Sequence, residues 1–176
     1  WQDMKACDNK SRLSTWADGM ALSGNMGGRL AVLDGDTRNG CNIAAVEQML
    51  DAMSIRTYAT VETPSGGRHW YVAGHPGLPT VHATADRDGF TGYPGLELIS
   101  HGANVFLPGT QRPKYAGAGY TILSSELGLL ADEGDEESAE NLAAWVASHR
   151  VIQPMEEFEA GPVWDGKEPD ARESAY

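Results

Sequence analysis

Three carboxylates on two short apolar segments could bind divalent metal ions. Asp34 and Asp36 follow the apolar run Leu30–Leu33, and Glu97 lies inside the apolar segment Gly95–Ile99. Residues two apart on a strand point to one face, so the two aspartates should lie close together. Such acids repel each other unless cations lie between them, and hard oxygen ligands suit Mg²⁺ or Mn²⁺. Solvated aspartates in a turn are the alternative for this pair, and an outward-facing glutamate is the alternative for Glu97.

The same three acids would support a specific kind of catalysis. Three carboxylates on two strands can hold two metal ions, and two-metal sites serve nucleotidyl transfer. In that reaction one ion activates the attacking 3′-hydroxyl and the other clamps the triphosphate. Gly35, between the two aspartates, has no side chain and is predicted to let a ligand approach closely.

A glycine-rich turn within TPSGGRHWY could bind phosphate. The backbone N–H groups of its glycines could cradle an anion, and its serine could donate a hydrogen bond. The arginine and the histidine could supply positive charge, but they are adjacent on a predicted strand, so only one can face the site. A tight hairpin with a surface histidine is the alternative. The predicted phosphate contacts are Ser65, Gly66, Gly67, Arg68 and His69.

The hydrophobic pattern predicts the elements that position these residues. Two helices are expected, one capped by Asn42 and running to about Met53, the other over Ser138–Arg150. Strands 57–63 and 68–73 should form one hairpin, and strands 95–99 and 103–107 a second. Further short strands are predicted at 30–33 and 120–123, and residues 74–95 are expected to form a long loop. The fold class is therefore α+β with a largely antiparallel sheet.

Composition indicates an ordinary globular domain of 176 residues, 41% apolar and 22% charged. No apolar run approaches the roughly 18 residues of a membrane span, so no membrane partner is expected. The two cysteines, Cys7 and Cys41, are not in a C-x-x-C pair. We expect reduced thiols, a cytoplasmic protein and no structural zinc.

The net charge of −12 argues against a DNA-binding protein until its distribution is considered. Residues 1–131 carry 10 Lys/Arg and 12 Asp/Glu, whereas residues 132–176 carry 3 Lys/Arg and 13 Asp/Glu. The body is therefore close to neutral. Residues 153–176 are predicted to be an acidic tail or linker, and residues 1–152 the catalytic domain.

Three segments, VLDGDTRNG, TPSGGRHWY and GLELISHGANVFLPGT, together resemble one family of replication enzymes. They are similar, in order and spacing, to the bifunctional DNA primase/polymerase domain of the archaeo-eukaryotic primase superfamily. The similarity covers roughly residues 12–123. It implies a catalytic module related to the RNA-recognition fold, with a small α/β subdomain. By position, it implies that Asp34, Asp36 and Glu97 bind metal and that His69 contacts nucleotide phosphates.

Some positions depart from or extend the family pattern. The family more often has Asp where this chain has Glu97, and glutamate reaches about one methylene further. More sequence usually precedes the segment that Ser14–Trp16 resembles, so the N-terminal part is expected to be shortened. Arg112 and Lys114 follow the loop Pro108–Thr110 and could reach phosphate or template, with solvated surface charge as the alternative.

The resemblance implies template-directed primase/polymerase activity in phage or plasmid DNA replication, in the host cytoplasm. Its partners would be a DNA template and primer, dNTP or NTP substrates, and a helicase domain later in the same polypeptide. Two other functions remain open on the residues alone. Acids with a histidine also occur in metal-dependent nucleases, and a non-catalytic nucleotide- or DNA-binding module could keep the same fold.

Overall fold

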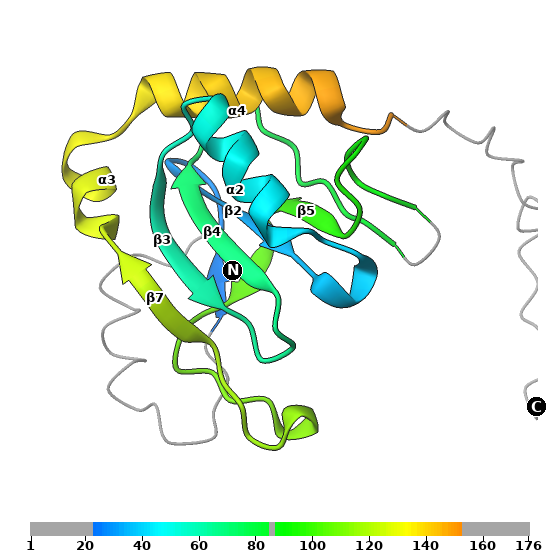
Figure 1. Ribbon diagram of the computed structural model, residues 1–176. Helices are drawn as coiled ribbons and strands as arrows, with labels where there is room; N and C mark the ends of the chain where they lie inside the picture. The colour runs from blue at the N-terminus through cyan, green and yellow to red at the C-terminus, as the bar shows by residue number, and fades with distance from the viewer. Residues whose placement is uncertain (1–22, 85–86, 153–176) are drawn as a thin grey trace, which may run out of the picture.

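A five-stranded antiparallel sheet with the order β5-β2-β4-β3-β7 lies at the centre of the fold (Figure 1). This computed structural model describes residues 23–84 and 87–152. Every neighbouring pair of strands in the sheet is antiparallel, which confirms the predicted α+β class. The strands are β2 (Leu30–Gly35), β3 (Thr57–Glu62), β4 (Arg68–Ala73), β5 (Leu96–Ile99) and β7 (Thr121–Ser125).

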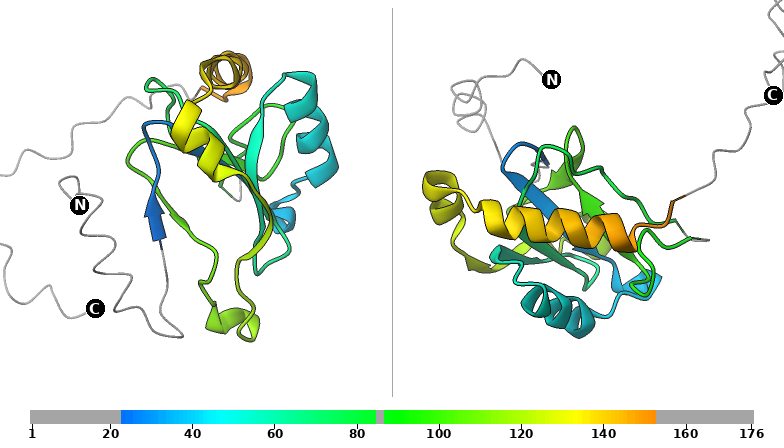
Figure 2. Two further views of the ribbon diagram at one scale, coloured as in Figure 1. Left: turned by 90° about the vertical axis from the view of Figure 1, so that its left-hand side faces the viewer. Right: turned by 90° about the horizontal axis from the view of Figure 1, so that it is seen from above.

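Helix α2 (Ile43–Ala52) covers one face of this sheet, and helix α4 (Glu136–His149) crosses one end of its strands (Figures 1 and 2). The short α3 (Leu127–Glu133) follows β7 and packs through Leu130 with Tyr58 and Ala73. The side view in Figure 2 shows α2 on one side of the sheet and the β1–β6 pair on the other. Apolar residues that alternate along β2, β4 and β5 meet the apolar faces of α2 and α4 in one core. This core includes Leu33, Trp70, Leu98, Val46, Met49, Leu142 and Trp145.

The opposite face packs against a two-stranded ribbon of β1 (Ser23–Asn25) and β6 (Asn104–Phe106). Val32, Tyr71 and Ile99 on the sheet form a second core with Met26 and Val105. The predicted hairpin between segments 95–99 and 103–107 is therefore wrong. Strand β5 pairs with the open edge of β2, and β6 pairs with β1.

The other predicted elements are confirmed with small changes of boundary. Asn42 caps α2, and its side chain accepts a hydrogen bond from the backbone N–H of Ala45 at 3.2 Å. Strands β3 and β4 form the predicted hairpin, with a register shift between Thr57 and Ala59. Helix α4 begins at Glu136 because the side chain of Asp135 caps it, accepting from the N–H of Ser138. The sequence analysis did not predict β1 or α3.

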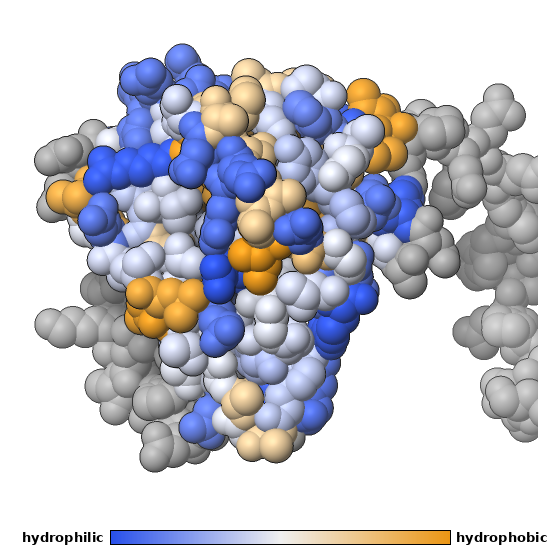
Figure 3. Space-filling view, in the orientation of Figure 1, coloured by the Kyte–Doolittle hydropathy of each residue, from blue (hydrophilic) through white to orange (hydrophobic). Residues whose placement is uncertain are grey.

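The edge strand β7 carries an exposed apolar patch. All five of its residues are exposed, and Ile122 and Leu123 keep 54% and 50% of their surface accessible. Figure 3 shows apolar side chains gathered over this edge. The strand therefore contributes backbone pairing with β3 while burying little of its own apolar surface.

Two predictions fall outside the described residues. These are the segment around Ser14–Trp16 and the acidic tail 153–176, so the proposed domain boundary stays a prediction. Within residues 23–84 and 87–152, no helix is long and apolar enough to cross a membrane.

Candidate active site

The register of the central strands brings three predicted site residues together. Asp34 on β2 lies opposite His69 on β4 and opposite Glu97 on β5. Directly opposed residues of an antiparallel pair point to the same face. That face is the one away from α2, since Leu33 and Trp70, one position along, enter the core beneath the helices. Asp34 Oδ2 lies 3.4 Å from His69 Nε2.

Alternation along β4 separates His69 from its neighbour Arg68. The histidine faces Asp34 and is only 2% exposed. Arg68 points to the helical face, where its Nη1 donates to Glu47 Oε1 on α2 at 2.8 Å. The structure therefore does not bring Arg68 to the site, although the sequence analysis had included it. Within the described residues the buried Nδ1 of His69 has no hydrogen-bond partner.

Asp36 lies just beyond β2, where it caps the 3₁₀ turn η1 (Thr37–Asn39). Its Oδ1 accepts from the backbone N–H and the Nε of Arg38, both at 3.0 Å. Its Oδ2 accepts from Arg38 Nη2 at 2.6 Å. These bonds to the Arg38 guanidinium hold the pKa of Asp36 below its usual range. The sequence analysis missed Arg38, although a cation two residues after a predicted metal ligand is a visible signal.

Gly35 faces the core rather than a ligand. A Cβ at this position would lie 2.7 Å from Cys41 Sγ and 2.8 Å from Trp70 Cζ3. The absent side chain thus makes room for Trp70, and the predicted close approach of a ligand at Gly35 is not what the structure shows. Burial raises the pKa of the Cys41 thiol to about 11, so this thiol stays protonated at neutral pH.

The tip of the β3–β4 hairpin uses its own amides. The N–H of Gly66 donates to the Thr63 carbonyl at 2.9 Å, and that of Gly67 donates to Thr63 Oγ1 at 3.0 Å. Both amides have acceptors inside the turn, so neither is placed as a free donor to a phosphate. The hydroxyls of Ser65 and Thr63 lie 3.1 Å apart, and both residues line the adjacent pocket.

This pocket, of about 140 Å³, gathers most of the predicted residues. It is smaller than the roughly 300–1,000 Å³ of sites that enclose a whole ligand, so it suits a phosphate group better than a complete nucleotide. Six predicted residues line it: Asp34, Asp36, Ser65, His69, Arg112 and Lys114. Five others also line it: Arg38, Thr63, Phe106, Tyr115 and Tyr120.

The loop between β6 and β7 forms the cationic and aromatic side of the pocket. The guanidinium of Arg112 lies 4.4 Å from the centre of the Phe106 ring. The centre of the Tyr120 ring lies 5.4 Å from the centre of the His69 ring and 6.0 Å from the centre of the Phe106 ring. The Tyr115 hydroxyl, from the 3₁₀ turn η2 (Pro113–Tyr115), accepts a hydrogen bond from Arg38 Nη1. The sequence analysis missed Phe106 and Tyr115 because neither belongs to a periodic pattern.

Glu97 lies beside Asp34 but outside this pocket. Its Oε1 accepts from the backbone N–H of Ala83 at 2.9 Å, and its Oε2 lies 3.6 Å from His82 Nδ1. Burial raises the pKa of Glu97, and the negative charge of Asp34 raises it further, against the opposing effect of the Ala83 hydrogen bond. Glu97 is therefore a partly desolvated carboxylate next to a second acid.

The donor chemistry suits Mg²⁺ or Mn²⁺, but the present arrangement of the side chains does not. Within the described residues, no three Asp, Glu, His or Cys side chains converge closely enough to hold a metal ion. Asp36 is turned onto Arg38, and Glu97 is bonded to the backbone of Ala83. A metal site at these acids therefore requires at least one of them to change partner.

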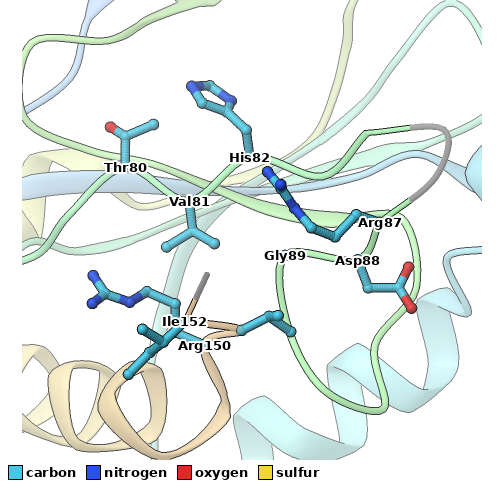
Figure 4. A pocket seen from close by; sticks show the side chains of 9 residues that line it. Thr80, Val81, His82, Arg87, Asp88, Gly89, Arg150 and Ile152 are labelled. Atoms are coloured by element: carbon cyan, nitrogen blue, oxygen red, sulfur yellow. The ribbon is translucent and has the colours of Figure 1, made fainter. Parts of the chain in front are cut away.

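A larger pocket, of about 290 Å³, lies beyond Glu97 at the β5 edge of the sheet. Figure 4 shows its two arginines, Arg87 and Arg150, on separate segments at its rim. Of the residues singled out from the sequence as a site, none lines it. His82 borders both regions because it lines this pocket and lies close to Glu97. The larger volume is thus separate from the cluster of predicted residues.

Comparison with known proteins agrees with the sequence motifs. Residues 2–145 match the family model described as "Bifunctional DNA primase/polymerase, N-terminal". This range contains all the residues that line the smaller pocket. No curated protein matches the chain significantly.

Proposed function

The chain belongs to the bifunctional DNA primase/polymerase family, and from this premise we propose that its smaller pocket carries out template-directed nucleotidyl transfer. The family implies a nucleotidyltransferase with DNA and nucleotides as substrates. The proposal adds the site, the use of (d)NTPs to extend a primer or an initiating nucleotide, and a role in phage or plasmid replication. One observation carries it: Asp34, His69 and Glu97 are in cross-strand register on one face of the sheet.

In this proposal the phosphate groups of the nucleotide enter the pocket from the side of the β6–β7 loop, and the rest of the nucleotide lies outside it. Arg112 and Lys114 supply positive charge there, and the Ser65 hydroxyl is placed to donate a hydrogen bond. His69 contacts a phosphate from the floor of the pocket. The exposed Phe106 ring, 36% accessible and already beside Arg112, offers a surface on which a base can stack.

Asp34, Asp36 and Glu97 are the residues proposed to bind Mg²⁺ or Mn²⁺. Divalent ions in such sites neutralise the charge of the triphosphate and orient the reacting oxygens. The support is the shared face of Asp34 and Glu97 and the position of both aspartates at the pocket. Arg68, Gly66 and Gly67 are left out because their polar groups already have partners elsewhere.

A primer-extension assay tests the proposal against its two alternatives. The full chain is incubated with a labelled primer on a DNA template, dNTPs and either Mg²⁺ or Mn²⁺. Lengthening of the primer supports nucleotidyl transfer. Shortening of the primer would instead indicate a metal-dependent nuclease, and binding with no change of length a non-catalytic module.

A further inference from the structure

Arg38 occupies the carboxylate that the proposed function assigns to a metal ion. Three of its side-chain and backbone nitrogens donate to Asp36, two of them from the guanidinium at 3.0 and 2.6 Å. The remaining guanidinium nitrogen, Nη1, donates to the hydroxyl of Tyr115 on the β6–β7 loop. The arginine thereby joins the predicted metal ligand to the loop that carries Arg112 and Lys114.

The other strong arginine pairs of the described residues have a structural purpose at a distance from the pocket. Arg68 ties β4 to α2 through Glu47, and Arg56 ties the start of β3 to Glu126 before α3. Arg38 instead pairs with a residue two positions away, on its own turn, and its side chain remains 53% exposed. The turn does not need the guanidinium for its cap, because Asp36 also accepts from the Arg38 backbone N–H.

We propose that Arg38 is a mobile cation that blocks Asp36 in the free protein and moves to the triphosphate when a metal–nucleotide complex binds. This inference rests on the proposed function. A guanidinium and a divalent ion compete for the same carboxylate oxygens and repel each other across a few ångströms. The triphosphate that enters with the metal offers the displaced guanidinium a bidentate partner of higher charge. Arg38 is thus a positioning residue that couples metal binding to nucleotide binding.

This exchange accounts for the present orientation of Asp36, one of the two proposed metal ligands that face other partners. With its two oxygens held by Arg38, Asp36 turns toward η1 rather than toward Asp34. Release of the guanidinium frees Oδ2 of its 2.6 Å bond, while Oδ1 keeps the bond from the Arg38 backbone N–H that caps the turn. The Tyr115 hydroxyl already accepts from Nη1, and the centre of its ring lies 5.7 Å from the guanidinium carbon, so the arginine has a second partner at the pocket when it leaves Asp36.

The test uses Arg38→Ala in the full chain and two separate titrations. In the first, Mn²⁺ alone is titrated without nucleotide and free Mn²⁺ is followed by electron paramagnetic resonance. The variant should bind Mn²⁺ roughly three- to tenfold more tightly, because an exposed ion pair no longer competes and one positive charge is gone. In the second, dATP is titrated at saturating Mn²⁺, where the competition is absent. There the variant should bind dATP about tenfold more weakly, because a charge-assisted contact is lost.

Matched variants separate the possible failures. Arg56→Ala removes an arginine of similar exposure, 49%, that pairs with Glu126 outside the pocket, and should change neither affinity. Asp36→Asn should weaken Mn²⁺ binding, and an unchanged affinity would mean that the proposed metal site itself is wrong. If Mn²⁺ binding depends on Asp36 but Arg38→Ala does not tighten it, the blocking role of Arg38 is refuted. If Arg38→Ala binds Mn²⁺ more tightly but its affinity for dATP is unchanged, the movement of the Arg38 guanidinium to the triphosphate is refuted.

Discussion

Asp34 and His69 lie opposite each other on β2 and β4, with Asp34 Oδ2 3.4 Å from His69 Nε2. The side chain of Asp34 keeps 28% of its surface accessible, whereas that of His69 keeps 3%. The aspartate is therefore the member of the pair that can change partner when a ligand binds. The histidine is almost wholly buried within the sheet and yet lines the pocket.

Replacing Asp34 should separate activity from stability. Asp34→Asn keeps the shape of the side chain but removes its charge, so nucleotidyl transfer should fall below detection in a primer-extension assay. The melting temperature without metal should change by no more than a few degrees, because the asparagine can still face His69. Near-parental extension by this variant would show that the site has been assigned to the wrong residues.

His69 and Arg68 provide a test based on alternation along one strand. His69→Ala should weaken dNTP affinity by about tenfold or more, the effect of losing a charge-assisted hydrogen bond. Arg68→Ala, one position away on the opposite face, should leave dNTP affinity unchanged while losing its contact with Glu47. Calorimetric titration of both folded variants with dATP would measure this. Equal effects of the two substitutions, or none from His69→Ala, would remove His69 from the nucleotide site.

The faces of the strands could be predicted from the sequence because alternation is a local property. Asp34, His69 and Glu97 each follow the period of two within their own strand, and the structure places all three on one face. The pairing partner of each strand, in contrast, depends on segments that are distant in the sequence. Strand β5 pairs with β2 and β6 pairs with β1, and both partners lie far from these strands in the sequence. No pattern within residues 95–107 contains that information.

Hydrogen-bond partners at the site could not be predicted for a similar reason. The glycines of the β3–β4 turn suggested free amides, but the threonine at its start accepts from both of them. Arg38 was visible beside the acids, yet the direction of a long side chain depends on the carboxylate and the hydroxyl that surround it. The sequence thus indicated six of the residues that line the pocket, and the structure shows which partners their polar groups already have.

Gly35 is expected to be essential for packing. Gly35→Ala would place a methyl group 2.7 Å from Cys41 Sγ and 2.8 Å from Trp70 Cζ3, two buried groups with little room to move. Overpacking of this kind costs about 1–3 kcal/mol, which urea unfolding can measure. Gly128→Ala is the matched control, since it lies in α3 with nothing within 4 Å of the added Cβ. That substitution should be neutral or slightly stabilising; a loss of stability equal to that of Gly35→Ala would contradict the argument.

The contributions of Glu97 and Asp36 to the stability of the fold should change with pH in opposite directions. The folded pKa of Glu97 is raised, chiefly by burial, so the folded state binds the extra proton between the ordinary and the raised pKa. Stability therefore falls as pH rises through that window, and the loss is complete above it. Glu97→Gln keeps an acceptor for the Ala83 N–H and should be more stable than the parent at pH 7. The difference should disappear below about pH 4, where a glutamate of ordinary pKa is protonated.

Asp36→Asn should behave in the opposite way. The folded pKa of Asp36 is lowered by Arg38, so its contribution to stability is present above the ordinary pKa and is lost as pH falls through the lowered one. The variant should be less stable than the parent at pH 7 and equal to it in strong acid. Melting temperatures measured between pH 2 and pH 8 would decide both cases. If both variants were more stable than the parent at pH 7, or both less stable, the result would be inconsistent with these pKa shifts.

Removal of residues 153–176 should strengthen DNA binding at low salt. This segment carries 7 Asp/Glu and 2 Lys/Arg and is therefore a source of negative charge that repels DNA phosphates. A chain ending at Ile152 keeps the bond from the Val151 N–H to the Gly89 carbonyl, which secures the end of α4. Fluorescence anisotropy with labelled single-stranded DNA should show tighter binding at low salt. The gain in DNA affinity should fade as the salt concentration rises toward 0.3 M, where the Debye length is roughly 6 Å.

The contrary view is that Phe158 and Trp164 anchor the segment to the body, as aromatic residues often do. A truncated chain that melts at a lower temperature or loses primer extension would support that view and refute the electrostatic one.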